Sequence, residues 1–479
     1  MKKFFSYPYF FPLFISFLFF IAYAALGVIK HNHFLSGYDL AVIDQAIWHY
    51  SHLQLPISTN HAYAFTPIYW DHVELIFPLF APLYWIWSDV RALIILQAFV
   101  MCSSGFAVYL IAKKYAVKTV VASALLVSYL MFYGIQNALW SDVHSLVFGV
   151  GFLAWFLYFS LTKYNRWTWI FFFLTIFSKE DMALITAIIS LLLFWKTKQK
   201  QYLFFLGISC VYLVFIFTIY FPFFIPGGYR FQNKSGLLSH LDATTLYNTS
   251  DKRDVLLYSS VWFGFLPFLS PLFLLPAFFD LVKYFVVANA NVTSGQSLFG
   301  HYRSMLALLF VWPTIITIGR YKKLNNIYIA CYLLLFALFI QYQLHLPLSY
   351  FSKQWFWTKP ASTNTIEQML TKIPPDASIA TQINILPHLS HRKLEFVLWP
   401  DTKDFLINSP CGQKNCTWFR IADKPQYILV DTATDWDVRY WLTDRNTFIQ
   451  GLQNMEKAGV ITQKQTIDTT TLYVVIKKP

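Results

Sequence analysis

The stretch YFFPLFISFLFFIAYAALGVI at residues 9–29 decides the fold class. It carries no charged side chain and reaches the roughly 20 residues that a helix needs to cross a bilayer. Lys2 and Lys3 precede it, as in a signal-anchor, and no cleavage site of small residues follows. We therefore expect a retained membrane helix at the start of the chain.

The composition of the whole chain agrees with this beginning. Hydrophobic residues make up 57% of the 479 residues and charged residues only 13%, whereas a typical soluble domain has about 25% charged residues. A water-soluble chain of this composition could not cover its surface with polar groups. Disordered, collagen-like and disulfide-rich classes are excluded as well, so the sequence predicts an all-α polytopic membrane protein.

Ten further apolar stretches have the character of membrane helices, although some of them are short. Segment 73–87 is also apolar, but it contains Pro78 and Pro82, and we expect a juxtamembrane or re-entrant helix on the outer face there. The eleven predicted spans are residues 9–29, 92–112, 119–133, 143–161, 167–177, 182–195, 202–224, 255–269, 272–288, 304–318 and 327–346.

Basic residues predict the direction of these spans. Lysine and arginine gather in the loops after the second, fourth, sixth and tenth spans, so the net charge of +13 is mainly a topology signal. If these loops and the N-terminus are cytoplasmic, every acidic residue before residue 347 except Asp280 falls in an outer loop. We expect a multi-pass plasma-membrane protein with a cytoplasmic N-terminus. No basic run is long enough to suggest a nucleic-acid partner.

Charged residues become frequent after residue 347, which predicts a membrane domain at 1–347, including a first outer loop at 30–90, and a small extracytoplasmic α/β domain at 348–479. Helices and strands alternate in this second domain. We expect helices at 365–372 and 447–457, and strands at 377–381, 427–431 and 472–476. Cys411 and Cys416 could form a local disulfide or remain free thiols.

Polar residues gather in the predicted outer loops. Asp39 and Asp44 lie in the first outer loop, and Asp44, Trp48 and His52 follow one another at helical spacing. Polar residues at membrane depth are costly, so their concentration on one face indicates a site, although charges at helix ends also serve as caps or interfacial anchors. The other outer clusters are Asp71, His72 and Glu74; Asp142 and His144; Lys179, Glu180 and Asp181; and His301, Tyr302 and Arg303.

Five stretches carry a family resemblance: GYDLAVIDQAIW from Gly37, WDHVEL from Trp70, WSDVH from Trp140, FSKEDMAL from Phe177 and PPDASIATQINILPHLSHRKLEFVLWP from Pro374. They resemble the bacterial and archaeal membrane family catalogued as domain of unknown function 2079, and the resemblance covers nearly the whole chain. Its layout is similar to the GT-C superfamily of membrane glycosyltransferases, which is an analogy at the level of the fold.

The GT-C likeness implies an inverting sugar transfer at the outer membrane face. The donor would be a sugar on polyprenyl phosphate, held among membrane lipids, and the acceptor a lipid, glycan or protein. GT-C enzymes carry an acidic residue in the first outer loop, and Asp39 matches that position. Asp39, with Asp44 as a second catalytic candidate, would take the proton from the acceptor hydroxyl.

The leaving phosphate requires positive charge, a metal or both. The residues expected to bind substrate are Lys179, Glu180, Asp142, His144, His301, Tyr302 and Arg303. Asp71, His72 and Glu74 offer oxygen and nitrogen ligands for a divalent cation such as Mg²⁺ or Mn²⁺.

Two other functions stay open at this point. A transporter or flippase of lipid-linked glycans would carry ionisable residues deep within spans or an internal repeat, and only Asp280 and Lys283 lie within a predicted span. A non-catalytic membrane scaffold would use the outer α/β domain to bind a partner, and Asp39 would then be dispensable.

Overall fold

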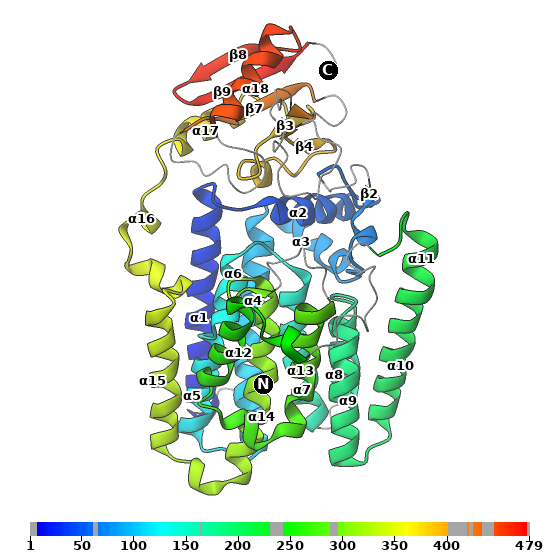
Figure 1. Ribbon diagram of the computed structural model, residues 1–479, viewed down its shortest axis with the longest axis vertical. Coiled ribbons are helices and arrows are strands. Elements are labelled where there is room, and N and C mark those ends of the chain that lie inside the picture. The colour runs from blue at the N-terminus through cyan, green and yellow to red at the C-terminus, as the bar shows by residue number, and fades with distance from the viewer. Residues whose placement is uncertain are drawn as a thin grey trace. The chain divides into compact units, whose positions relative to one another are not determined.

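A computed structural model describes residues 7–60, 66–162, 165–229, 243–287, 296–400, 419–420, 425–433 and 445–476. The chain forms two compact units. We call the first, formed by Met1–Val28, Tyr69–Phe77 and Ile94–Lys353, the helical unit. We call the second, formed by Ile29–Ile68, Pro78–Leu93 and Gln354–Pro479, the mixed unit. Figure 1 shows the helices and strands of each.

The helical unit is built mainly from apolar α-helices (Figure 1). Its helices are α1 (Tyr7–Asn32), α4 (Arg91–Lys114), α5 (Thr119–Leu130), α6 (Tyr133–Trp140), α7 (Ser145–Thr162), α8 (Asn165–Ile176), α9 (Met182–Thr197), α10 (Gln201–Phe215), α11 (Phe221–Phe224), α12 (Ser250–Trp262), α13 (Leu275–Val282), α14 (Ser304–Arg320) and α15 (Ile327–Gln343). Single helical turns extend several of them, and a π-helix, η8 (Lys283–Val287), continues α13.

Five helices of the described chain are long and apolar enough to cross a membrane. They are Tyr9–Asn32, Arg91–Lys114, Ser145–Thr162, Gln201–Phe224 and His301–Arg320. α5 and α6 add a sixth if the pair, bent by 43°, is one span. Several membrane helices are therefore confirmed, but the number eleven is not.

Two of the eleven expected spans, 255–269 and 272–288, are interrupted. Gly264 and Phe265 both have positive φ, 59° and 58°, and end α12. A Cβ at Gly264 would lie 2.0 Å from the ring of Tyr332, so only glycine fits there. Proline residues then keep the following turns short, because proline lacks the amide hydrogen that a continuous helix requires.

The mixed unit contains a five-stranded sheet in the order β4-β3-β7-β9-β8. β3 (Ile379–Thr381) is parallel to its neighbours β4 (Glu395–Val397) and β7 (Tyr427–Asp431). β9 (Thr470–Val475) is antiparallel to both β7 and β8 (Ile461–Ile467). The α/β pattern and the expected strands at 377–381, 427–431 and 472–476 are confirmed, whereas β4 and β8 were not expected.

Both faces of this sheet are covered, because alternate residues of each strand enter different cores. Ile428 and Val430 pack with α18 (Arg445–Lys457) on one face. Leu429 packs on the other face with α17 (Thr363–Leu370) and with Phe34, which comes from the segment after α1. The first outer loop thus supplies part of the core of the mixed unit.

Further segments of the first outer loop complete the mixed unit. They are α2 (Tyr38–Ser51), the strand pair β1 (Ile57–Ser58) and β2 (Thr66–Pro67), and α3 (Ala81–Ile86). α3 and the turn before it form a short apolar helix, Phe77–Ile86, at the place where a short helix was expected. The short strands β5 (Trp399–Pro400) and β6 (Phe419–Arg420) pair with each other.

The chain leaves the helical unit at Lys353, and the domain boundary expected after residue 347 stays a prediction. Most of the loop at 30–90, expected with the membrane helices, is grouped with the C-terminal residues. Hydrogen bonds explain this grouping: the Thr59 hydroxyl donates to the Glu395 carbonyl oxygen over 2.6 Å, and Gln45 donates to the Arg392 carbonyl oxygen over 3.2 Å. Cys411 and Cys416, and any disulfide between them, lie outside the described residues.

Gly134 provides the first prediction. A Cβ at this position in α6 would lie 2.2 Å from the carbonyl oxygen of Arg303, so Gly134→Ala must displace the turn η10 (His301–Arg303). We expect a loss of about 1–3 kcal/mol in stability, measured as a lower midpoint of thermal unfolding in detergent. The control is Gly207→Ala in α10, where nothing lies within 4 Å of the added Cβ. Equal midpoints for the two variants would contradict the prediction.

Candidate functional site

A group of ionisable side chains, which we call the charge cluster, lies at loop ends of the helical unit. The loop between α8 and α9 carries Lys179, Glu180 and Asp181. Lys179 and Glu180 are buried, as is Arg303 at the start of α14. The other members are His72, Glu74 and Lys283, with the rings of Tyr284 and Tyr302 between them. Burying this many charges in an apolar unit is costly unless they are paired.

Several donors surround the carboxylate of Glu180 in the charge cluster. Its carboxylate accepts hydrogen bonds from the Val73 amide over 3.0 Å and from the Tyr229 hydroxyl over 3.0 Å. The Nδ1 atom of His72 lies 2.8 Å from the same group. Burial alone would raise the pKa of Glu180, but His72 and Lys179 outweigh it and lower the pKa to about 2. Glu180 is therefore a fixed negative charge.

His72 and Glu74 differ from Glu180 in their protonation. Burial and Lys179 oppose a charged imidazole, but the carboxylate of Glu180 prevails and raises the pKa of His72. Burial raises the pKa of Glu74 to about 7, against the effects of His72 and Lys179, and the Ser145 hydroxyl donates to it. Near neutral pH Glu74 can gain or lose a proton, which suits acid–base chemistry.

The three cations of the charge cluster have different partners. Lys283 lies 2.7 Å from Asp181 and 3.0 Å from Asp280, so carboxylates neutralise it. Burial opposes the charge of Lys179, but the carboxylates of Asp181 and Glu180 prevail and raise its pKa. Lys179 also lies 5.9 Å from the ring centre of Tyr302, and Arg303 lies 4.8 Å from that of Tyr284. Such cation–π contacts stabilise a positive charge without neutralising it.

Two histidines border the charge cluster. The rings of His144 and His301 are stacked with centres 3.5 Å apart, and His301 lies 3.9 Å from the ring centre of Tyr302. Gln97 accepts a hydrogen bond from the amide of His144 and so fixes the start of α7. Asp142 is half-buried in the turn before His144. These contacts thus connect most of the residues predicted as substrate or metal ligands: His72, Glu74, Lys179, Glu180, His144, His301, Tyr302 and Arg303.

The predicted metal site does not fit this arrangement. The described residues, which include Asp71, His72 and Glu74, contain no group of three or more His, Cys, Asp or Glu side chains that could hold a metal ion. His72 directs Nδ1 to Glu180, and Glu74 accepts a hydrogen bond from Ser145. Both side chains are therefore engaged with protein partners.

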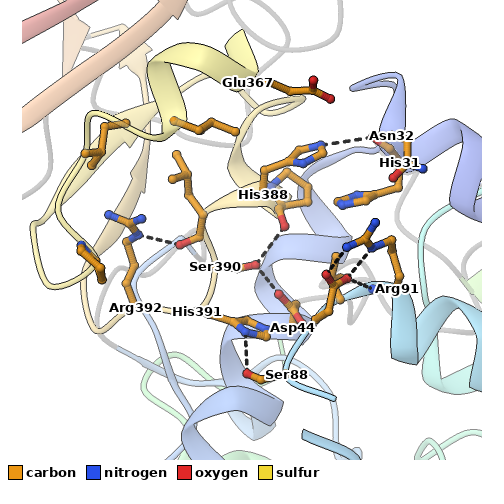
Figure 2. Close-up of a pocket in the computed structure, with 17 residues that line it drawn as sticks. His31, Asn32, Asp44, Ser88, Arg91, Glu367, His388, Ser390, His391 and Arg392 are labelled. Atoms are coloured by element: carbon orange, nitrogen blue, oxygen red, sulfur yellow. Dashed lines mark hydrogen bonds and ion pairs between the residues drawn. The ribbon is translucent and has the colours of Figure 1, made fainter. Parts of the chain in front are cut away.

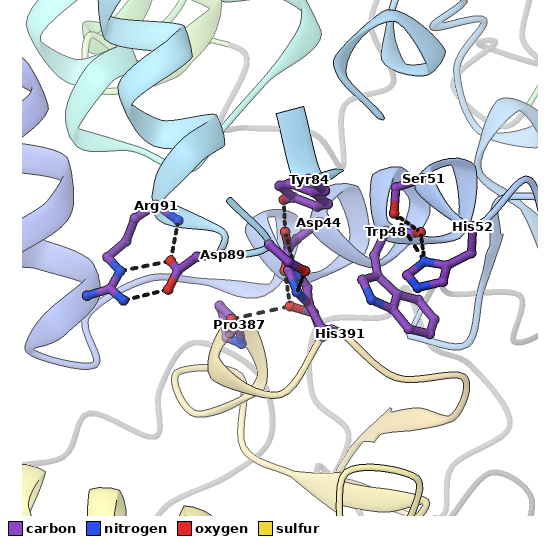
Figure 3. Close-up of polar contacts among 11 residues, drawn as sticks. Asp44, Trp48, Ser51, His52, Tyr84, Asp89, Arg91, Pro387 and His391 are labelled. Carbon is purple, nitrogen blue, oxygen red and sulfur yellow. Dashed lines mark hydrogen bonds and ion pairs between the residues drawn. The ribbon is translucent and has the colours of Figure 1, made fainter. Parts of the chain in front are cut away.

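The two predicted catalytic carboxylates belong to the mixed unit and differ sharply in environment. Asp39 is exposed in the first turn of α2. Asp44 is fully buried. The hydroxyls of Tyr84 and Ser390 both donate to its carboxylate. Its Oδ1 atom lies 3.1 Å from His391 Nε2, and Figure 3 shows Tyr84 and His391 beside it.

Asp44 borders a cavity of about 430 Å³ within the mixed unit, which we call the α2 pocket (Figure 2). On one side Arg91 forms a paired contact with Asp89, at 2.8 and 2.5 Å. On another side the ring of His388 stacks between His31 and Phe34, with centres 4.0 and 3.8 Å away. Burial lowers the pKa of His388 well below its usual value, so its imidazole is uncharged.

Several residues of the two sites were not predicted as site residues. In the charge cluster these are Asp181, Lys283 and Tyr284, and in the α2 pocket they are Tyr84, Ser390 and His391. His391 is separated from Asp44 by 347 positions in the chain, and no local spacing connects them. Asp181 was grouped in the sequence with Lys179 and Glu180, but it was not predicted to bind substrate.

The apolar helices with a buried charge cluster, joined to a small mixed sheet, define a multi-pass membrane protein. The chain belongs to the family described as predicted membrane protein (DUF2079), whose model matches residues 30–459. The resemblance seen in the sequence is thereby confirmed. Comparison with curated proteins gives no match.

The ion pair of His72 and Glu180 provides the second prediction. In a double-mutant cycle with His72→Gln and Glu180→Gln, we expect a coupling free energy on the order of 2 kcal/mol, because the pair is largely shielded from water. The exposed pair Lys359 and Glu367, at 3.1 Å and 48% and 47% exposure, is the control. Its coupling should stay below about 1 kcal/mol.

The pH dependence of this coupling follows from the two pKa directions. Glu180 has a lowered pKa, so its contribution is complete above about pH 4.5 and is lost as the pH falls towards 2. His72 has a raised pKa, so its contribution is complete below about pH 6.5 and is lost at higher pH. We expect maximal coupling between about pH 4.5 and 6.5, and a flat profile would contradict the assignment.

Proposed function

We propose that this protein is a membrane glycosyltransferase that moves a sugar from a polyprenyl-phosphate donor to a hydroxyl acceptor at the outer membrane face. The observation that carries the proposal is the burial of two cations, Lys179 and Arg303, beside the aromatic rings of Tyr302 and Tyr284. A leaving phosphate develops negative charge, and preorganised positive charge stabilises it most in a site that excludes water.

The aromatic residues support the same proposal. Tyr284 and Tyr302 lie with ring centres 4.8 Å apart beside the two cations. Faces of aromatic rings pack well against the apolar side of a sugar as well as against cations. The charge cluster thus combines positive charge, which suits a phosphate, with aromatic rings, which suit a sugar.

Proton transfer from the acceptor is assigned to Asp39 rather than Asp44. Asp44 is buried and already accepts from Tyr84 and Ser390, so a further proton would disrupt two hydrogen bonds. Asp39 is exposed at the start of α2 and matches the acidic position of GT-C enzymes in the first outer loop. Glu74, with a pKa of about 7, is a second group able to exchange a proton near neutral pH.

Topology supports an outer location for this chemistry. The positive-inside rule places the basic loops after α4, α7, α9 and α14 in the cytoplasm. In that orientation three parts of the chain are extracytoplasmic: the loop with Lys179 and Glu180, the turn η10, and the mixed unit. Polyprenyl-phosphate sugars offered at that face would then reach the charge cluster.

One observation favours transport of a lipid-linked glycan as the second candidate. Asp280 and Lys283 form a buried ion pair around the end of α13, and Lys283 also reaches Asp181. Ionisable pairs between helices are a recurring feature of transporters. Movement of the lipid-linked sugar without cleavage of its phosphate bond would distinguish this function from transfer.

Lys179 gives the third prediction. Lys179→Gln removes a buried positive charge and should lower the rate of sugar transfer from polyprenyl-phosphate sugars by at least about 100-fold, measured with purified protein in lipid nanodiscs. Lys323→Gln, an exposed lysine in the loop after α14, should leave the rate unchanged. If Lys179→Gln leaves the rate of sugar transfer unchanged, the phosphate of the donor does not bind beside Lys179.

Asp39 gives the fourth prediction. Asp39→Asn keeps the shape of the side chain but cannot accept a proton, so the transfer rate should fall about 100-fold or more while donor binding persists. Asp468→Asn is the matched control, because Asp468 is exposed in the turn between β8 and β9 with a φ of 50° that asparagine tolerates. Unchanged transfer by Asp39→Asn would overturn the assignment of the base.

A further inference from the structure

Ser88, His391 and Asp44 form a connected row in the α2 pocket. The Ser88 hydroxyl oxygen lies 3.0 Å from His391 Nδ1, and His391 Nε2 lies 3.1 Å from Asp44 Oδ1. Figure 2 shows the imidazole between the hydroxyl and the carboxylate. A hydroxyl, a base in hydrogen-bond reach and a third group that orients the base are the signature of an activated nucleophile.

The partners of Asp44 determine which nitrogen carries the proton. The hydroxyls of Tyr84 and Ser390 both donate to this carboxylate, which therefore acts as an acceptor. The contact from His391 Nε2 must then be an N–H that donates to Asp44. In the neutral imidazole, Nδ1 is left as an acceptor, and the Ser88 hydroxyl donates to it. This is the tautomer in which His391 can take the proton of Ser88.

The surroundings favour reaction at Ser88 rather than a purely structural role. Ser88 is exposed and lines the cavity, whereas Asp44 is buried beneath it. The volume of about 430 Å³ lies within the range of small-molecule sites. Leu370, Ile373 and Leu389 give the cavity an apolar side. A substrate with an apolar acyl chain and a polar reactive bond would suit this lining.

We propose that the α2 pocket is a second active site, of the serine-hydrolase type, that cleaves carboxylic esters. The Ser88 oxygen attacks the ester carbonyl carbon while its proton moves to His391 Nδ1. The tetrahedral intermediate collapses, the bond to the alkoxy group breaks, and the alcohol leaves with the proton from His391. Water then hydrolyses the acyl-serine, with His391 again taking and returning a proton. This activity is independent of sugar transfer at the charge cluster.

Each member of the row has a distinct role. Ser88 and His391 touch the reacting atoms and are catalytic residues. Asp44 is a positioning residue, because it accepts the hydrogen bond from Nε2 of His391 and so fixes the orientation of the ring. Tyr84 also lies against the imidazole, with ring centres 4.8 Å apart, and Trp48 lies 6.4 Å away. Burial opposes a charged His391, but the carboxylates of Asp44 and Asp89 prevail and raise the pKa of its imidazole.

A fluorophosphonate probe tests the proposal without knowledge of the natural ester, because it labels only activated serines. The full-length protein in detergent is treated with the probe, and the labelled residue is identified by mass spectrometry. We expect modification of Ser88 at least about 100-fold faster than of Ser352, an exposed serine in the helical unit. Ser88→Ala should abolish this labelling, and Ser352→Ala should leave it unchanged.

Further variants separate catalysis from structure. His391→Gln should slow labelling of Ser88 about 100-fold or more with an unaltered unfolding midpoint. Asp44→Asn presents an amide that can donate a hydrogen bond to His391 Nε2. The imidazole proton would then move to Nδ1, where His391 can no longer accept the proton of Ser88. We therefore expect the pH profile of labelling to change shape. Labelling of Ser88 no faster than of Ser352, or equally fast in His391→Gln, would overturn the proposal. Loss of sugar transfer in Asp39→Asn with retained labelling of Ser88 would show that the two activities are separate.

Discussion

The charge cluster depends on the neutralisation of one buried carboxylate. Glu180 lies in the loop between two apolar helices, where an unpaired charge would cost several kcal/mol. His72, the amide of Val73 and the hydroxyl of Tyr229 together compensate this charge. These donors belong to two distant segments of the chain, so the carboxylate fixes the positions of both against the loop. The neighbouring Lys179 and Asp181 then extend the same arrangement towards Tyr302 and Lys283.

The first outer loop shows a comparable constraint in the mixed unit. Phe34 fills one side of the sheet, and Thr59 and Asn60 bond to Glu395 at the start of β4. Burial raises the pKa of Glu395 well above its usual value, so it is held as a neutral acid. A hydrophobic contact and polar contacts therefore both hold the loop to a sheet that begins more than 300 residues later.

The sequence predicted the parts of the fold that local physics determines. Apolar stretches without charge became helices, and the run Tyr427–Asp431 became a strand with the predicted bounds. Breaks at Gly264 and Phe265 depend on a positive φ and on the nearby ring of Tyr332, which no local pattern reveals. Contacts such as that of Asp44 with His391 join residues far apart in the chain, so their partners could not be predicted from spacing.

The two aspartates of α2 show how helix geometry assigns different chemistry to like residues. Five positions separate Asp39 from Asp44, which turns their side chains about 140° apart around the helix axis. One carboxylate is thereby exposed and the other is buried against Tyr84, Ser390 and His391. A carboxylate that already accepts several hydrogen bonds orients its partners, whereas an exposed one is accessible to an acceptor hydroxyl. The same helix can therefore supply a base from one face and an orienting group from the other.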